Sequence, residues 1–180
     1  MKIAFISDIH GMAVTLKKAL DHADRMNAEK IVILGDILYH GPRNGVPDLY
    51  DPAQVVNLLN ARKSQLMAVR GNCDAEVDQM LLNFPIMADY SELFCDDQRF
   101  FLTHGHLWNE NHLPELPENT ILAHGHTHIA ALKKIPGGPV IFNPGSISLP
   151  KNTVQHSFGW FDGKNLNILA LEDASPLKLA

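Results

Sequence analysis

The sequence lacks the features of exported, membrane-spanning and disulfide-stabilised proteins. Its 180 residues contain only two cysteines, Cys73 and Cys95, which are too few for a disulfide framework. No apolar run approaches the roughly 18 residues of a membrane span, and the chain enters a strand-like segment at once, without a basic region or a cleavage site. We therefore expect a soluble, cytoplasmic protein with no membrane partner.

Positive charge is also scarce. The chain has 15 Lys and Arg against 20 Asp and Glu, a net charge of −5, and no local basic cluster. This balance gives no electrostatic footprint for a nucleic-acid polymer, and an anionic substrate would need metal ions or local arginine and backbone donors. The length fits one domain covering residues 1–180. Ten histidines are many for such a chain, so their positions decide the interpretation.

The segment 3–11 begins as a buried strand and ends in ligand-type residues. Asp8 and His10 follow its apolar run, and in an extended segment side chains two positions apart point to the same side. Gly11 then lets the chain turn away. Taken alone, such a pair is also typical of a strand that ends in turn and capping residues. Three later stretches of the same form favour a metal site.

The remaining pattern predicts an α/β protein. A helix over about 12–27 and a strand over 31–34 form a βαβ unit with parallel strands. A loop over 39–51 precedes a helix that Asp51 caps. We further expect strands at 66–69, 100–103, 121–123, 140–142, 157–161 and 165–171, a helix ending near 82, and a short helix within 107–120. Residues 84–98 receive no assignment, and the second half is expected to be a meander that extends or covers the sheet.

Oxygen and nitrogen ligands follow most of these strands. They are Asp8, His10, Asp36, Asn72, His104, His126 and His128. Open α/β sheets bind ligands at the carboxyl ends of their strands. Seven ligands are too many for one tetrahedral zinc, but they divide into two sites if Asp36 bridges. Without a thiolate the set suits Mn²⁺, Fe²⁺, Ni²⁺ or Zn²⁺, so we expect two divalent transition metal ions, with Mn²⁺ favoured.

These motifs resemble those of the calcineurin-like metallophosphoesterases. The D-x-H, G-D, G-N-H-[DE], lone H and G-H-x-H motifs of that family appear in order as Asp8-Ile9-His10, Gly35-Asp36, Gly71-Asn72-Cys73-Asp74, His104 and Gly125-His126-Thr127-His128. Together with Asn143-Pro144-Gly145-Ser146, they are most similar to its small bacterial and archaeal phosphodiesterases. The resemblance implies a four-layer α/β/β/α sandwich. It also implies one metal on Asp8, His10, Asp36 and His128 and a second on Asp36, Asn72, His104 and His126.

The expected function is metal-dependent hydrolysis of small phosphodiesters by a metal-bridging hydroxide. The catalytic candidates are Asp36, Asn72, Cys73 and Asp74. Cys73 replaces the histidine that in the family contacts phosphate and protonates the leaving group. Because a thiol is a poorer proton donor and adds no positive charge, we expect diesters to be favoured over monoesters. Asp74 resembles the acidic partner of that missing histidine.

Other residues have two interpretations each. Arg43, with His40 and Asn44, is a candidate phosphate contact in the loop 39–51, although Arg43 could equally serve only to anchor its loop. His106 and His124 flank ligands, and we expect packing or backbone hydrogen bonds there before a ligand-orienting role. His22, His112 and His156 are expected at the surface.

Competing functions differ in the features they need. A catalytically weak, metal-binding interaction scaffold of the same fold is the main alternative, but every ligand position is filled, which favours catalysis. A metallo-β-lactamase-like hydrolase lacks support because its H-x-H-x-D-H motif is absent. A nuclease of the same family would need a surface for a polymer, which the acidic balance does not provide. The resemblance also suggests a homo-oligomer, a dimer or tetramer, formed through exposed late strands.

Overall fold

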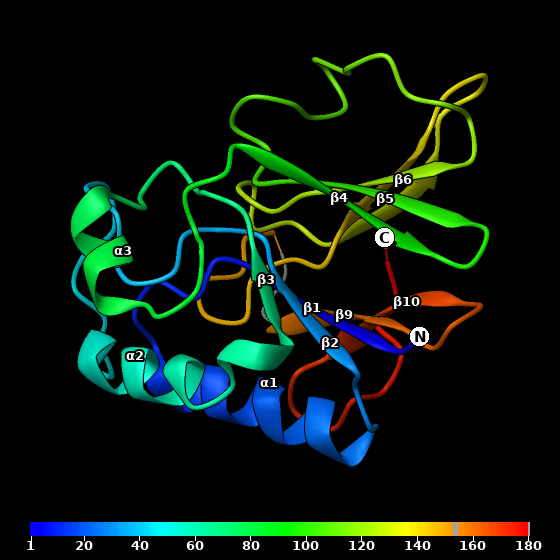
Figure 1. The fold of residues 1–180 in the computed structure, drawn as a ribbon. Helices are drawn as coiled ribbons and strands as arrows, with labels where there is room; N and C mark the ends of the chain where they lie inside the picture. The colour runs from blue at the N-terminus through cyan, green and yellow to red at the C-terminus, as the bar shows by residue number, and fades with distance from the viewer. Residues whose placement is uncertain (153–154, 180) are drawn as a thin grey trace.

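The computed structural model describes residues 1–152 and 155–179. In this part of the chain the strands form two five-stranded sheets that stack face to face, with helices against the outer face of the first sheet (Figure 1). None of the helices among the described residues has the length and apolar character needed to cross a bilayer.

Both ends of the chain contribute to the first sheet. Its order is β10-β9-β1-β2-β3, with β1 (Ile3–Ile6), β2 (Lys30–Ile33), β3 (Leu66–Ala68), β9 (Ser157–Phe161) and β10 (Leu166–Ala170). The strands β1, β2 and β3 are parallel, whereas β9 runs antiparallel to β1. The helix α1 (Ala13–Arg25) connects β1 to β2, and α2 (Pro52–Asn60) with a short 3₁₀ turn (Lys63–Gln65) connects β2 to β3. The predicted βαβ unit and the Asp51 cap, which accepts a hydrogen bond from Gln54 N at 3.0 Å, are confirmed.

The second sheet has its own order, β4-β5-β6-β8-β7. Its strands are β4 (Tyr90–Cys95), β5 (Gln98–Thr103), β6 (Thr120–Ala123), β7 (Ala131–Lys134) and β8 (Val140–Asn143). The central three are parallel, and β4 and β7 pair antiparallel at the edges. The meander expected for the second half of the chain is therefore wrong. The strands β5, β6 and β8 are parallel neighbours in a separate sheet, and among the described residues of this half β9 and β10 are the strands that return to the first sheet. The sequence did not predict β4, because this edge strand has no clean alternation of buried and exposed residues.

Alternating side chains of β1 divide the molecule into layers. Ile3 and Phe5 face the second sheet, where the ring centroid of Phe5 lies 5.4 Å from that of Phe100. Ala4 and Ile6 face α1 and α2. The outer face of the second sheet is covered by the extended segment 104–119, through Trp108, Leu113 and Leu116 (top of Figure 1). The short helix expected within 107–120 is absent from this segment, so the outer layer over the second sheet is irregular there.

The prediction that His22 lies at the surface is wrong. Its side chain on α1 is buried, its ring stacks on Phe158 at a centroid distance of 5.4 Å, and its Nε2 donates to Leu171 O at 2.9 Å. Polar neighbours in the helix indicated exposure, but the chain after β10 folds back over this face. His156 is half-buried and donates through Nδ1 to Ile147 O, and His112 is exposed as predicted.

Candidate metal centre

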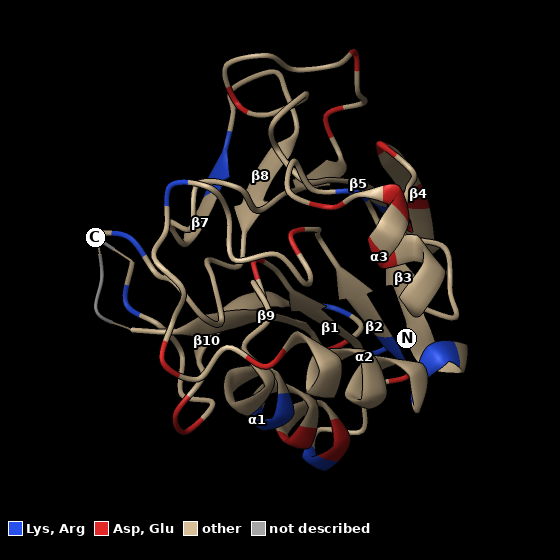
Figure 2. Cartoon of the chain, turned by 90° about the vertical axis from the view of Figure 1, so that its left-hand side faces the viewer, with Lys and Arg blue, Asp and Glu red and all other residues tan. Residues whose placement is uncertain are grey.

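The candidate ligands lie in the loops after five strands, three from the first sheet and two from the second, and these loops meet at one edge of the sandwich. Figure 2 looks onto this edge and shows Asp and Glu segments (red) in the loops between the two sheets. Five of the seven candidate ligands are buried, His126 is half-buried and Asn72 is exposed. The short helix α3 (Glu76–Leu81) follows the loop after β3 and lies at the same edge (Figure 1). The convergence predicted from the strand order is thus present.

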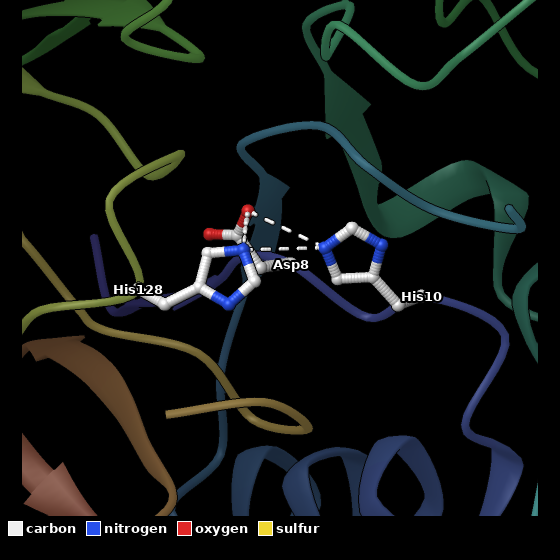
Figure 3. Close-up of side chains that lie close together, drawn as sticks. All are labelled: Asp8, His10 and His128. Carbon is white, nitrogen blue, oxygen red and sulfur yellow. Dashed lines mark hydrogen bonds and ion pairs between the residues drawn. The ribbon is translucent and has the colours of Figure 1, made fainter. Parts of the chain in front are cut away.

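Asp8, His10 and His128 form the first group (Figure 3). Asp8 Oδ1 lies 3.2 Å from Nε2 of His128 and 3.9 Å from Nε2 of His10, and the two Nε2 atoms are 3.3 Å apart. Asp36 Oδ2 lies 3.6 Å from the same His10 nitrogen. Carboxylate oxygens and imidazole nitrogens that face one point at these distances could hold one divalent cation.

Asp36 faces two groups at once. Its Oδ2 lies 3.6 Å from His10 Nε2 and 3.4 Å from His104 Nε2, while its Oδ1 accepts a hydrogen bond from Cys73 N at 2.8 Å. The second group continues through Asn72, whose Oδ1 is 3.1 Å from His104 Nε2. The ring of His126 lies 5.1 Å from that of His104, between centroids. A carboxylate in this position could be shared by two cations.

The imidazole rings are held with one nitrogen toward the centre. Nδ1 of His10, His104 and His128 donates to the backbone carbonyls of Tyr39, Leu34 and Leu149, at 2.7, 2.6 and 2.6 Å. A ring that donates through Nδ1 presents the lone pair of Nε2 when neutral, which is the form that binds a metal. The backbone therefore holds these three rings in the orientation that metal ligands need.

One oxygen of Asp8 fits a metal ion particularly well. Oδ2 accepts hydrogen bonds from Ser7 Oγ at 2.7 Å and His126 N at 3.1 Å. Oδ1 is buried and has no hydrogen-bond partner among the described residues. A buried carboxylate oxygen without a hydrogen bond is costly unless a cation neutralises it. The donor set and this oxygen together fit a divalent ion.

The ligands sit on unusual backbone, which corrects the extended geometry assumed from the sequence. The φ angles of Asp8, His10, Asp36, His126 and His128 lie between 48° and 67°, in the left-handed region. Such residues cost on the order of 1–2 kcal/mol each. Hydrogen bonds between the turns hold them in place, for example from His10 N to Asp36 O at 2.9 Å. The side chains converge because the turns direct them, not because a strand continues.

Glycine at position 71 is required by close packing under Asp36. A Cβ atom at Gly71 would lie 2.1 Å from Asp36 Oδ1 and 2.3 Å from Asp36 N, so any larger residue would displace the Asp36 carboxylate. This is the physical reason for the glycine that precedes Asn72.

Charge in the centre is balanced between buried carboxylates and imidazoles. Burial alone would raise the pKa of Asp36, but the hydrogen bond and charge of His104 hold it well below its usual range. Burial alone would lower the pKa of His104, but Asp36 and Asp8 raise it to about 9. The carboxylates thus favour a positive charge among these ligands, and a divalent cation would supply it while the imidazoles stay neutral.

Asp74 holds the turns rather than facing the centre. Its Oδ2 accepts hydrogen bonds from Asp36 N at 2.9 Å and Gly71 N at 2.7 Å, and its Oδ1 accepts one from Ile37 N at 2.8 Å. Burial raises the pKa of Asp74 to about 6 although these donors oppose the shift. The hydrogen bonds of Asp74 therefore position the turns that carry Asp36 and Gly71.

Cys73 lies beside Asp36 at the edge of the centre. Its side chain is half-buried, and burial together with the charge of Asp36 raises the pKa of the thiol to about 12. The group at this position is therefore a neutral thiol at physiological pH.

A cavity of about 340 Å³ opens over the two groups. It is lined by His10, Asp36, Gly41, Pro42, Arg43, Asn44, Asn72, Cys73, His126, Thr127, His128 and Lys151. Arg43 forms no hydrogen bond or ion pair with any described residue, so the structure does not support the loop-anchoring interpretation. Asn44 lines the cavity and also donates to His40 O at 2.8 Å.

Two residues were misjudged from the sequence. His40 does not line the cavity, because its ring packs against Tyr39 and Tyr50. Lys151 lines it and was missed, since it stands outside every motif. The only available signal was its nearness in sequence to the Asn143-Pro144-Gly145-Ser146 segment. Ser146 Oγ of that segment donates to Asp8 O at 2.8 Å, which ties this part of the chain to the centre.

The two histidines that flank ligands differ. His124 is buried and its Nδ1 donates to Gly125 O at 3.0 Å, a backbone contact as expected. His106 is half-buried, with its ring 5.5 Å from that of His104, and its Nδ1 has no hydrogen bond to a described residue. Neither is seen to orient a ligand through a hydrogen bond.

Comparison with known proteins identifies the family. Residues 1–165 match the calcineurin-like phosphoesterase superfamily domain. The chain belongs to this superfamily. The expectation of a metal-dependent phosphoric diester hydrolase is confirmed by this membership together with the similarity to the phosphodiesterase described below. The fold class is confirmed as well, since a solved structure of the phosphoesterase YfcE from Escherichia coli superimposes with a TM-score of 0.95 at 46% identity, covering 99% of this chain and 97% of that chain.

Curated relatives of this family include bacterial and archaeal proteins. Phosphodiesterase YfcE of Escherichia coli is 46% identical over 175 residues, covering 97% of this chain and 95% of that protein. Phosphodiesterase MJ0936 of Methanocaldococcus jannaschii is 26% identical over 155 residues, covering 81% of this chain and 83% of that protein.

Proposed function

We propose that this chain is a phosphodiesterase that hydrolyses small phosphodiesters at a dinuclear metal centre. The observation that carries the proposal is the position of Asp36 Oδ2, which lies 3.6 Å from His10 Nε2 and 3.4 Å from His104 Nε2 and so can serve both groups. The names of the two curated relatives, both phosphodiesterases, agree with the hydrolysis of a phosphodiester.

The first cation would be held by Asp8, His10, Asp36 and His128, and the second by Asp36, Asn72, His104 and His126. Divalent ions held there would supply Lewis acidity, which would lower the pKa of a bound water molecule and polarise the phosphoryl oxygens. The oxygen and nitrogen donors favour Mn²⁺, with Ni²⁺, Fe²⁺ or Zn²⁺ as alternatives. A location in the cytoplasm, a single domain over residues 1–180 and assembly into a dimer or tetramer stay predictions.

The protein's own side chains orient the substrate and exclude competing ones. The Arg43 guanidinium and the Lys151 ammonium line the cavity and can neutralise the phosphodiester anion. The carboxylate of Asp74 fixes the positions of Asp36 and Gly71, because it accepts hydrogen bonds from the backbone N–H groups of Asp36, Ile37 and Gly71. The neutral thiol of Cys73 adds no positive charge, so a dianionic monoester is held less well than a monoanionic diester.

Metal removal tests the proposal. Chelator-stripped protein should not hydrolyse bis(p-nitrophenyl) phosphate, and refilling with Mn²⁺ should restore turnover at two bound ions per chain. Rates and metal content are measured on the same samples, with p-nitrophenyl phosphate as the comparison ester. Two bound ions without turnover of either ester, under each of the four metals, would instead support the interaction scaffold.

Replacing Lys151 with methionine should weaken substrate binding without stopping catalysis. An exposed ammonium that attracts the anion equally before and during reaction contributes uniform binding, so KM for bis(p-nitrophenyl) phosphate should rise about threefold to tenfold while kcat changes little. The rise should shrink at high salt. Lys134→Met, on the exposed end of β7, is the control. An unchanged KM at low salt would argue against the contact.

A further inference from the structure

A second cavity, of about 440 Å³, adjoins the one above the metal centre. Its lining consists of Tyr39, Pro42, Asn72, Cys73, Ala75, Val77 and Asp78. Pro42, Asn72 and Cys73 line both cavities, so the second cavity continues directly from the place where the phosphate is expected to bind. It lies between the loop 39–51 and the start of α3.

The walls of this second cavity are mainly apolar and uncharged. Tyr39 and Val77 are 40% and 60% exposed and line the cavity, so both present apolar surface there that the fold leaves accessible. Pro42 and Ala75 add two further apolar walls. An apolar wall beside a polar reaction centre is typical of a site that holds the non-reacting part of a substrate.

The charges of the two cavities differ. Arg43 and Lys151 line the cavity over the metal centre but not the second one. Among the described residues that line the second cavity there is no Lys, Arg or His, and the one ionisable carboxylate is Asp78. An additional phosphate or carboxylate on the substrate would therefore be repelled there, whereas an uncharged group would not.

We propose that this second cavity is a subsite for an aryl or comparably apolar ester group of the phosphodiester. The substrate class is then a monoanionic diester with at least one uncharged, apolar ester group, its phosphate near Arg43 and Lys151 and its ring against Tyr39, Pro42 and Val77. This inference rests on the proposed function, because it takes the phosphate to lie over the metal centre. It adds specificity determinants outside the ligand motifs.

Paired anions test the subsite without requiring turnover. Binding of phenylphosphonate and methylphosphonate to the Mn²⁺-loaded protein is measured by calorimetry. The phenyl compound should bind at least about tenfold more tightly, the factor that burial of roughly 60 Å² of apolar surface provides. Val77→Asp should reduce the ratio of the two affinities to within about twofold. Taking the ratio removes the general repulsion of anions by the new carboxylate.

The matched control is Met80→Asp on the same short helix. Met80 is 83% exposed and does not line the cavity, so the ratio should stay as in the unaltered protein. The Val77 variant should fold, because its side chain is exposed and an acidic residue in the first turn of a helix is favourable.

The outcomes separate the subsite from the function. The subsite would be overturned if the unaltered protein bound the two anions with equal affinity. It would also be overturned if Val77→Asp and Met80→Asp reduced the ratio of the two affinities equally. Failure of both anions to bind would contradict the metal centre and the subsite together. The unaltered protein could prefer the phenyl compound and lose this preference in Val77→Asp, and yet not hydrolyse diesters. That result would support the subsite and contradict only the proposed reaction.

Discussion

Asp36→Asn should reduce hydrolysis of bis(p-nitrophenyl) phosphate by at least about a thousandfold, because a loss of several kcal/mol of charge stabilisation corresponds to about that factor. Asp36 Oδ2 faces both His10 and His104, so one substitution weakens both groups of ligands. The amide keeps the shape of the carboxylate and can still accept the hydrogen bond from Cys73 N. The loss should therefore come from charge and not from unfolding.

The measurement combines kcat with metal content after refilling with Mn²⁺. The variant should retain fewer than two ions per chain. Asp48→Asn, which removes an exposed carboxylate in the loop 39–51, should bind metal and turn over substrate as the unaltered protein does. Two retained ions with turnover within tenfold of the original would contradict a bridging role for Asp36.

Cys73→His should raise the ratio of monoesterase to diesterase activity by at least about tenfold, since a positioned general acid contributes at least that much. Burial and the charge of Asp36 raise the pKa of the Cys73 thiol to about 12, so it remains neutral and adds no charge next to the phosphate. An imidazole can be protonated near neutral pH, which would neutralise a dianionic monoester and protonate its leaving alcohol. Cys73 lines both cavities, so a ring has room there.

The test compares kcat/KM for p-nitrophenyl phosphate and bis(p-nitrophenyl) phosphate. Cys73→Ser, another neutral side chain of similar size, should leave the ratio within about threefold. A histidine variant with the ratio of the unaltered protein would show that the residue at this position does not set the choice of ester.

The convergence of the candidate ligands was predictable because each of them follows a strand in a short motif. Asp36 and Asn72 are preceded by glycines, and the structure gives the reason at Gly71, where a side chain would collide with Asp36. Strand order then brings the motifs together, since parallel strands share a carboxyl edge. What failed was the local geometry, because the left-handed φ of Asp8 and His10 depends on hydrogen bonds to the neighbouring turn 35–37.

Residues outside the motifs could not be placed from local patterns. Lys151 reaches the cavity, and His22 is buried, only because distant segments pack against them. The contacts of Asp74, although it lies within a motif, also depend on distant segments, because its three backbone partners include Asp36 and Ile37, almost forty positions away. β4 was missed for a different reason, since an edge strand buries too few side chains to produce a period of two.

The pairing of β1 with β9 has a consequence for synthesis of the chain. β1 carries Asp8 and His10 at its end, and its second edge pairs with residues Gly159 to Phe161. A growing chain therefore leaves one edge of its first strand open until more than 150 further residues have been made, although all the ligands lie before position 129. Contacts so far apart in sequence form slowly. A chain truncated after β8 would contain every candidate ligand and yet keep that edge free to pair with another chain.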